Sequence, residues 1–275
     1  MSDGINEAVN RNSPANVAGL TNSGRATRNA KDAFGVLSIA VVVVSGLEII
    51  LRLTDTPNYV FPKPSAIIES LVNDFSTLYL EPLRTTVVTF IVGLTIGSTI
   101  GIVLAAVLTL RPKVEKLIAP YIIVMVTTPM LALVPFLMLK LGFGMAPRVI
   151  AVALASGPMV MLNSATGFKQ TPKLEMALAE SYGASTFQMF KKIRFPNALP
   201  MIIVGYMVGS IFGLITTIGA EMSGGGAGLG NRLVYFSSLV EMPRFGAVLV
   251  LISAFGVLIY SFFTILNLRY TKWQK

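Results

Sequence analysis

Long runs of apolar residues, separated by shorter polar stretches, dominate the sequence. A helix that crosses a lipid bilayer needs about 20 largely apolar residues, and six runs reach or approach this length once flanking small residues are included. They cover residues 34–53, 86–110, 117–139, 149–162, 198–220 and 245–268. Pro120, Pro129 and Pro135 interrupt the third run. The pattern predicts an all-α membrane protein with about six transmembrane helices.

The first 33 residues differ in composition from the rest of the chain. They are rich in Asn, Ser, Ala and Gly and contain few large apolar side chains, so they cannot bury enough surface to offset the entropy lost on ordering. We expect residues 1–33 to form a disordered cytoplasmic tail, residues 34–268 the transmembrane domain, and residues 269–275 a cytoplasmic C-terminal tail. The polar stretch is too long for a signal peptide.

The composition supports a membrane protein and excludes several kinds of chemistry. Of the 275 residues, 53% are hydrophobic and 13% are charged, whereas soluble domains carry about 25% charged residues. The sequence contains no His and no Cys, which excludes disulfides, Ser-His triads and zinc sites built from these residues. It contains no GxxxxGK[ST] motif, and the Gly-rich run at 223–230 lacks GxGxxG spacing. We therefore expect that run to be a flexible periplasmic turn.

The distribution of basic residues predicts the orientation. With six spans both termini lie on one side, and that side holds 15 of the 22 Lys and Arg residues but only six of the 13 Asp and Glu residues. Because Lys and Arg are enriched in cytoplasmic loops, both termini are predicted to be cytoplasmic. Nucleic-acid binding is the alternative for so basic a chain, but the basic residues flank the spans and form no patch with interleaved aromatic residues.

Two of the predicted spans carry a glycine at every fourth position. Spacing of four places each triplet on one helix face and permits close approach of another helix. The partner is either a helix of the same chain, which is favoured, or a second copy of the chain. The triplets are Gly93, Gly97 and Gly101 in the second span, and Gly205, Gly209 and Gly213 in the fifth.

The longest predicted cytoplasmic loop, residues 167–197, carries its own helix signals. Thr171 and Pro172 are typical of an N-cap followed by the first helical residue. Gly183 suits a left-handed cap at the end of that helix. The loop therefore begins with a short helix that stops at a glycine bend.

A second short helix is expected directly after this bend. Ser185 and Gln188 have the spacing of a capping box, and Pro196 is expected to end the helix. A structured excursion between two spans indicates a docking surface for a partner. The alternative is an amphipathic hairpin that rests on the lipid surface.

The same loop resembles that of a known family. The stretch Ala177-Leu-Ala-Glu-Ser-Tyr-Gly183, then nine residues, then Ile193-Arg-Phe-Pro196 is similar to the EAA loop of ABC-importer permeases. That loop reads EAA, three residues, Gly, nine residues, Ile, any residue, Leu, Pro. The spacings of Gly183, Ile193 and Pro196 match it.

The loop also departs from the family pattern. Ala177 stands where the family has Glu, Leu178 where it has the first Ala, and Phe195 where it has Leu. Any role that needs a carboxylate at position 177 is therefore in doubt, and Glu175 or Glu180 could serve instead.

The resemblance extends over roughly residues 45–265 and points to the nitrate, sulfonate and taurine group of these permeases. The further segments that carry it are residues 47–52, 61–66, 85–101, 129–135, 142–144, 220–222 and 228–230. It implies a type I ABC importer permease fold in a bacterial inner membrane.

The resemblance also implies partners. Two permease subunits, which are copies of one chain or two different chains, would pair with two cytoplasmic ABC ATPase subunits that bind ATP and Mg²⁺. A periplasmic or lipid-anchored substrate-binding protein would deliver a small solute, such as nitrate, a sulfonate, taurine or a related molecule. The permease itself would carry no cofactor, hold no metal and catalyse no reaction. The substrate, and whether the second permease is a copy of this chain, are not decided by the sequence.

By the same resemblance, the loop would be the coupling helix that docks on the ATPase. The residues assigned to this role are Leu174, Ala177, Leu178, Ala179, Glu180, Tyr182, Gly183, Phe187, Ile193 and Pro196.

Candidates for the transport path are residues of the third to fifth spans that offer polar or freed backbone groups. Glu221, at the outer end of the fifth span, is either only an interfacial charge or, as the resemblance over residues 220–222 implies, a residue with a gating or structural role. The alternative function is a self-sufficient secondary transporter or channel, but the span interiors are almost free of charge and show no convincing repeat. The path candidates are Pro129, Ser156, Asn163, Thr216, Thr217 and Glu221.

Overall fold

The computed structural model of the protein describes residue 35 and residues 38–224 and 226–270. Every regular element in these residues is helical, which confirms the predicted all-α class. The predicted tails, residues 1–33 and 269–275, lie wholly or largely outside the described residues. The chain divides into two units between Ala66 and Ile67.

The first unit contains a helix over residues 38–53 and a connection that leads into α3 (Pro64–Asn73). The Glu48 carboxylate joins this helix to Ser65 of the same unit, because it accepts hydrogen bonds from the backbone N–H of Ser65 at 3.0 Å and the Ser65 hydroxyl at 2.8 Å. Arg52, one helical turn away, donates to the same carboxylate at 2.6 Å. Glu48 thus places negative charge at the beginning of α3, where the helix dipole favours it.

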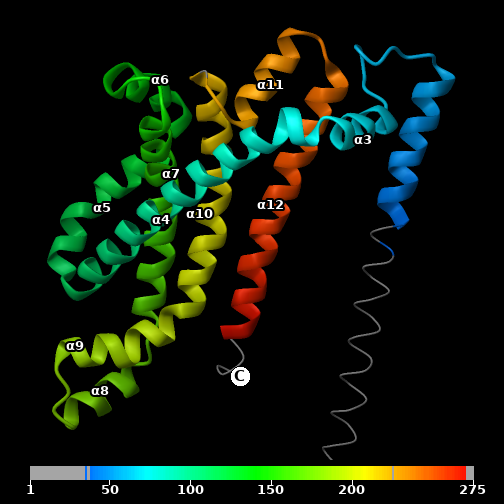
Figure 1. Ribbon diagram of the computed structural model, residues 1–275. Coiled ribbons are helices and arrows are strands. Elements are labelled where there is room, and N and C mark those ends of the chain that lie inside the picture. The colour runs from blue at the N-terminus through cyan, green and yellow to red at the C-terminus, as the bar shows by residue number, and fades with distance from the viewer. Residues whose placement is uncertain (1–34, 36–37, 225, 271–275) are drawn as a thin grey trace, which may run out of the picture. The chain divides into compact units, whose positions relative to one another are not determined.

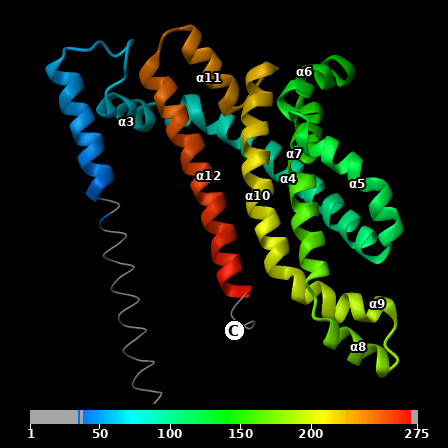
Figure 2. The ribbon, with the colours of Figure 1, turned by 180° about the vertical axis from the view of Figure 1, so that it is seen from behind.

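The second unit is built around three helices that run in a similar direction, α7, α10 and α12, with α4 crossing α7 obliquely (Figure 1). Figure 2 shows α8 and α9 at one end of this unit and α6 and α11 at the opposite end. The helices are α4 (Leu80–Leu110), α5 (Pro112–Thr127), α6 (Met130–Leu141), α7 (Met145–Lys169), α8 (Lys173–Ser181), α9 (Thr186–Met189), α10 (Phe195–Ser223), α11 (Leu229–Ser238) and α12 (Met242–Tyr270).

Four helical stretches of the described chain are long and apolar enough to cross a membrane. They contain four of the predicted runs, and each is longer than predicted because its ends continue past the apolar core. The first predicted run is helical from residue 38 onward, and its beginning lies outside the described residues. The four stretches are Phe75–Leu110, Met145–Lys169, Thr186–Ser223 and Met242–Tyr270.

The third predicted run, residues 117–139, is not one continuous helix. It is divided into α5 and α6, which are bent by 90° at a short break. Thr128 and Pro129 are both extended at this break, with ψ of 125° and 96°. Proline has no N–H and restricts the residue before it to extended conformations, so Pro129 breaks the helix. Pro120 and Pro135, in contrast, lie inside α5 and α6.

Both glycine triplets pack against α7, which decides their role in favour of packing within the chain. On α4, a Cβ added to Gly97 would lie 2.5 Å from the carbonyl oxygen of Ala153, and one added to Gly101 would lie 2.5 Å from that of Gly157. The α4 and α7 backbones are therefore nearly in contact. This close approach provides the van der Waals packing on which helix association in lipid depends.

The second triplet brings α10 against a different part of α7. A Cβ on Gly205 would lie 3.0 Å from Cβ of Asn163, and one on Gly209 would lie 2.8 Å from a methyl carbon of Val160. Gly213 is more open, because its nearest neighbour would be 3.4 Å away on the Phe90 ring. Helix α7 is thus enclosed between two helices, whereas α12 buries only a few residues near its beginning.

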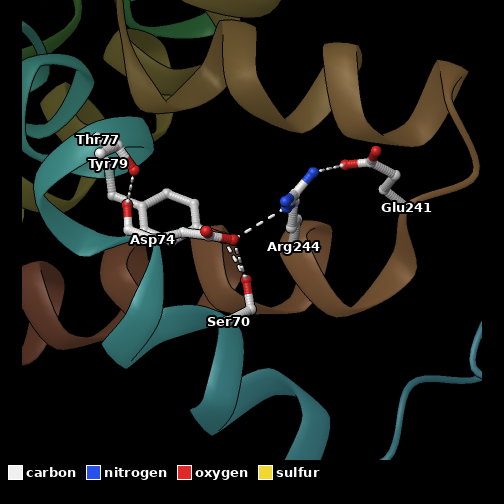
Figure 3. Close-up of polar contacts among 6 residues, drawn as sticks. All are labelled: Ser70, Asp74, Thr77, Tyr79, Glu241 and Arg244. Carbon is white, nitrogen blue, oxygen red and sulfur yellow. Dashed lines mark hydrogen bonds and ion pairs between the residues drawn. The ribbon is translucent and has the colours of Figure 1, made fainter.

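A polar network fastens the beginning of α12 to the junction between α3 and α4 (Figure 3). Arg244 donates to Asp74 at 3.0 Å and to Glu241 at 2.7 Å. The Ser70 hydroxyl lies 3.4 Å from the Asp74 carboxylate and 2.6 Å from the Tyr79 hydroxyl. The side chains are partly exposed, so each ion pair is expected to contribute no more than about 1 kcal/mol.

We predict that the two triplets tolerate an added methyl group differently. Gly97→Ala should lower the free energy of unfolding by about 1–3 kcal/mol, since the rigid backbone of α7 leaves no room for a Cβ. Gly213→Ala is the matched control and should be neutral or slightly stabilising, because alanine favours a helix over glycine by about 1 kcal/mol. Thermal unfolding of the purified variants in detergent measures both, and equal stabilities would contradict the packing described.

Candidate functional site

The loop between α7 and α10 folds into a compact pair of short helices, α8 and α9. Gly183 has a φ of +77°, a left-handed conformation that glycine adopts at little cost. The N–H of Gly183 donates to the Glu180 carbonyl at 2.9 Å, and that of Ala184 donates to the Ala179 carbonyl at 3.0 Å. These are the two bonds of a Schellman motif, so the predicted glycine cap is confirmed.

The beginning of α9 is also as predicted. The Ser185 hydroxyl accepts from the backbone N–H of Gln188 at 3.3 Å, and the Gln188 side chain accepts from the backbone N–H of Ser185 at 2.8 Å. This reciprocal capping box follows the glycine bend directly. Local hydrogen bonds therefore define the geometry of the bend on both sides.

Two details of the loop were predicted wrongly. Pro172, whose ψ is 128°, is the N-cap of α8 and not its first helical residue. The Thr171 hydroxyl caps nothing in α8 and donates to the Phe168 carbonyl at 3.1 Å, at the end of α7. Pro196 does not end a helix, since the helical stretch runs on from Thr186 to Ser223. A π-helical turn over Phe190–Arg194 precedes the proline, and such a wider turn accommodates the missing N–H and the ring.

The outer face of the hairpin presents large apolar side chains to solvent. The exposed fractions are 81% for Leu174, 57% for Leu178, 84% for Tyr182 and 71% for Phe187. Ala177, Glu180 and Gly183 are also exposed, while Ala179 is half-buried. Four large apolar groups on one short ordered loop form a surface whose burial by a partner or by lipid would lower the free energy.

The base of the hairpin is fixed to the ends of α7 and α10. Phe168 packs against Phe190, with ring centroids 5.0 Å apart, and against Phe195 at 6.4 Å. The Asn197 amide donates to the Glu175 carboxylate at 2.9 Å. Ile193 and Pro196 are half-buried at this junction. The base of the hairpin is therefore held against both of the helices that flank it.

Two of the candidates for the transport path meet at the break between α5 and α6. Pro129 and Thr216 both line a cavity of about 290 Å³, together with Thr127, Thr128 and Pro158. The two threonines at the break were missed in the sequence, although the Thr-Thr-Pro order was a signal for polar groups beside a helix end. Such a break supplies backbone and hydroxyl groups to an otherwise apolar cavity.

The other candidates lie outside the lining of this cavity. Ser156 and Thr217 are fully buried, and their hydroxyls bond to carbonyls of their own helices at 2.8 Å. Asn163 is half-buried and donates to the Met159 carbonyl at 2.8 Å. Ser156 and Asn163 are neighbours of the α10 glycines, so in this structure they form part of the helix packing.

Glu221 is fully buried near the end of α10 and holds several elements together. Its carboxylate accepts from the Thr86 hydroxyl of α4 and from the backbone N–H of Gly230 in α11, each at 2.9 Å. Arg148, at the beginning of α7, is 5% exposed and was missed in the sequence, where it looked like an ordinary flanking charge. No group of three or more acidic side chains that could hold a metal occurs in the described part of the chain.

Comparison with known proteins shows what this architecture belongs to. Residues 97–272 match the family described as binding-protein-dependent transport system inner membrane component. The chain is 25% identical to the formylaminopyrimidine transport permease protein ThiX of Halalkalibacterium halodurans, over 83% of this chain and 91% of that protein. It is 26% identical to the taurine transport system permease protein TauC of Escherichia coli, over 60% of each chain.

Solved structures give the same result for the fold. A chain of the MetNI methionine ABC transporter in an inward-facing conformation matches with a TM-score of 0.59 at 20% identity. The match covers 70% of this chain and 94% of that one, which confirms the predicted type I importer permease fold. The family match spans more than half of the sequence, and we conclude that this chain belongs to the family of binding-protein-dependent transport system inner membrane components, the permease subunits of ABC transporters.

Proposed function

We propose that the chain forms the translocation path of an ATP-driven importer for a small solute and that the α8–α9 hairpin couples it to a cytoplasmic ATPase. Two ATPase subunits, a second permease subunit and a substrate-binding protein would complete the transporter. ATP and Mg²⁺ would be bound by the ATPase alone, which agrees with the lack of a nucleotide motif in this sequence.

The observation that carries this proposal is the exposed apolar face of a rigid hairpin. Leu174, Leu178 and Tyr182 lie on or directly after α8, and Phe187 lies on α9. Capped bends hold them in place, so little further entropy would be lost when they enter a groove. Lipid could also cover an amphipathic hairpin, and the second experiment below separates these occupants.

The path for the solute is proposed at the cavity beside the break between α5 and α6. Its hydroxyl groups come from Thr127, Thr128 and Thr216, and no ionisable side chain lines it. A neutral, mostly apolar lining gives little selectivity for charge. Selection would then rest mainly with the binding protein, which agrees with relatives whose names give unrelated solutes, formylaminopyrimidine and taurine.

The first prediction concerns the bend of the hairpin. Gly183→Val should uncouple ATP hydrolysis from uptake, since a residue with a Cβ at this φ costs about 1–2 kcal/mol. No atom lies within 4 Å of a Cβ built at Gly183, so the effect would come from the backbone conformation and not from a clash. Gly183→Asn is the matched control and should keep most of the uptake, because asparagine tolerates left-handed conformations. Equal uptake by the two variants and the wild type would contradict the role of the bend.

The second prediction concerns the apolar face. Tyr182→Ala should weaken binding of the ATPase about 30-fold, which is the loss expected for a hot-spot tyrosine worth about 2 kcal/mol. Thr186→Ala, on the same hairpin, should bind as the wild type does. Titration of the detergent-solubilised permease with the purified ATPase measures both. If Tyr182→Ala lowers only the affinity for liposomes, the hairpin rests on lipid.

The third prediction concerns orientation, which follows from the excess of basic residues on the side of the hairpin. The sequence contains no cysteine, so a single introduced cysteine can be labelled without background. A membrane-impermeant maleimide added to intact cells should label Ser76→Cys, in the exposed turn before α4, but not Ser181→Cys, at the end of α8. Ser181→Cys should react only after permeabilisation, and the reverse pattern would invert the topology.

A further inference from the structure

Two buried charges lie on the helices that flank the hairpin, near the ends of those helices that are remote from it. Arg148 is in the first turn of α7 and Glu221 in the last turn of α10. They are the two buried charged side chains among the residues that the structure describes. Burying a charge is costly unless it is paired and hydrogen-bonded, so the groups that each of these side chains binds are expected to be held in place.

Glu221 stabilises the beginning of α11. One carboxylate oxygen accepts from the N–H of Gly230 in the first turn of that helix, and from the hydroxyl of Thr86. The Thr86 hydroxyl in turn accepts from the N–H of Leu229 at 2.9 Å. Two N–H groups that have no partner within α11 are thus satisfied, and the negative charge is favourable at this end of the helix.

Arg148 holds the segment that leads into α11. Its guanidinium donates to the carbonyl of Ala227 at 2.9 Å, and a Cβ on Gly226 would lie 2.6 Å from the same guanidinium. A Cβ on Gly228 would lie 2.6 Å from the Glu221 carboxylate oxygens. Residues 226–228 are therefore in close contact with both a cation and an anion, and glycine at two positions permits this close approach.

The same two helices continue to the hairpin at their other ends. They are joined there by the Phe168 contacts, and along their length by the close approach of Gly205 and Gly209 to α7. We propose that Arg148 and Glu221 are positioning residues that fasten the segment 226–230 and α11 to α7 and α10. A movement of the hairpin would then move this segment and α11 as well. The movement of the segment with the hairpin rests on the function proposed above. The attachment of the segment by Arg148 and Glu221 does not depend on that function.

The fastening can be tested in the purified full-length chain without any partner. Leu229→Cys is a reporter in the fully buried part of the segment, so it reacts slowly until the segment opens, and its backbone N–H still bonds to Thr86. Arg148→Met and Glu221→Gln should each raise the rate of its labelling by a maleimide about tenfold, as expected when a segment opens locally. The double variant should label no faster than the faster single variant, because both residues hold the same segment.

Three controls distinguish this effect from a general loss of packing. Arg148→Lys keeps a donor for the Ala227 carbonyl and should restore slow labelling. Glu241→Gln removes a carboxylate of the neighbouring network and should have no effect. Ser76→Cys should label at the same rate in all backgrounds. Unchanged labelling of Leu229→Cys in both single variants, or faster labelling of Ser76→Cys to the same extent, would overturn the proposal.

The proposed movement of segment 226–230 with the hairpin is tested in the assembled transporter. ATP should change the labelling rate of Leu229→Cys in the otherwise wild-type permease. In the Glu221→Gln background ATP hydrolysis should continue while this change is lost. A change that persists in that background would overturn the proposal. Failure of the ATPase to bind the hairpin at all would instead contradict the proposed function, and the Tyr182→Ala titration would show it.

Discussion

The close packing of α4 and α10 on α7 is the constraint on which the rest of the second unit depends. Lipid tails are as apolar as the side chains of a membrane helix, so moving these side chains from lipid to a protein contact gives little hydrophobic stabilisation. Helices in a bilayer therefore associate where their backbones can approach closely and pack. Gly97 and Gly101 provide this approach on α4, and Gly205 and Gly209 provide it on α10. Because rigid backbone lies on the α7 side of the α4 contacts, there is little room for adjustment, and the three helices form one tightly packed layer.

This layer has different chemistry at its two ends. At the end of α7 and the beginning of α10, aromatic contacts around Phe168 support a hairpin with an exposed apolar face. At the opposite ends, Arg148 and Glu221 are buried around a glycine-rich segment. An exposed apolar face thus lies at one end of these helices and a held segment at the other, and the movement that we propose would pass between them along the closely packed α7 and α10.

Proline has two opposite effects in this chain, and the local backbone decides which one applies. Pro129 follows an extended Thr128, and the helix breaks there and turns by 90°. Pro196 follows a π-helical turn, which makes room for its ring, and the helix continues. The break exposes polar groups to the cavity beside Thr216, whereas the continuous helix makes a stiff connection between the hairpin and α10.

The sequence by itself determined the features that depend on neighbouring residues. These include the all-helical class, most of the spans, the glycine cap at Gly183 and the capping box at Ser185, because helix signals and caps act over a few residues. It could not show that both glycine triplets share α7, that only Pro129 breaks the third run, or that Arg148 and Glu221 are buried around one segment. Those features depend on which distant helix faces each residue, and burial and contact over a hundred residues of separation are decided only when the helices pack.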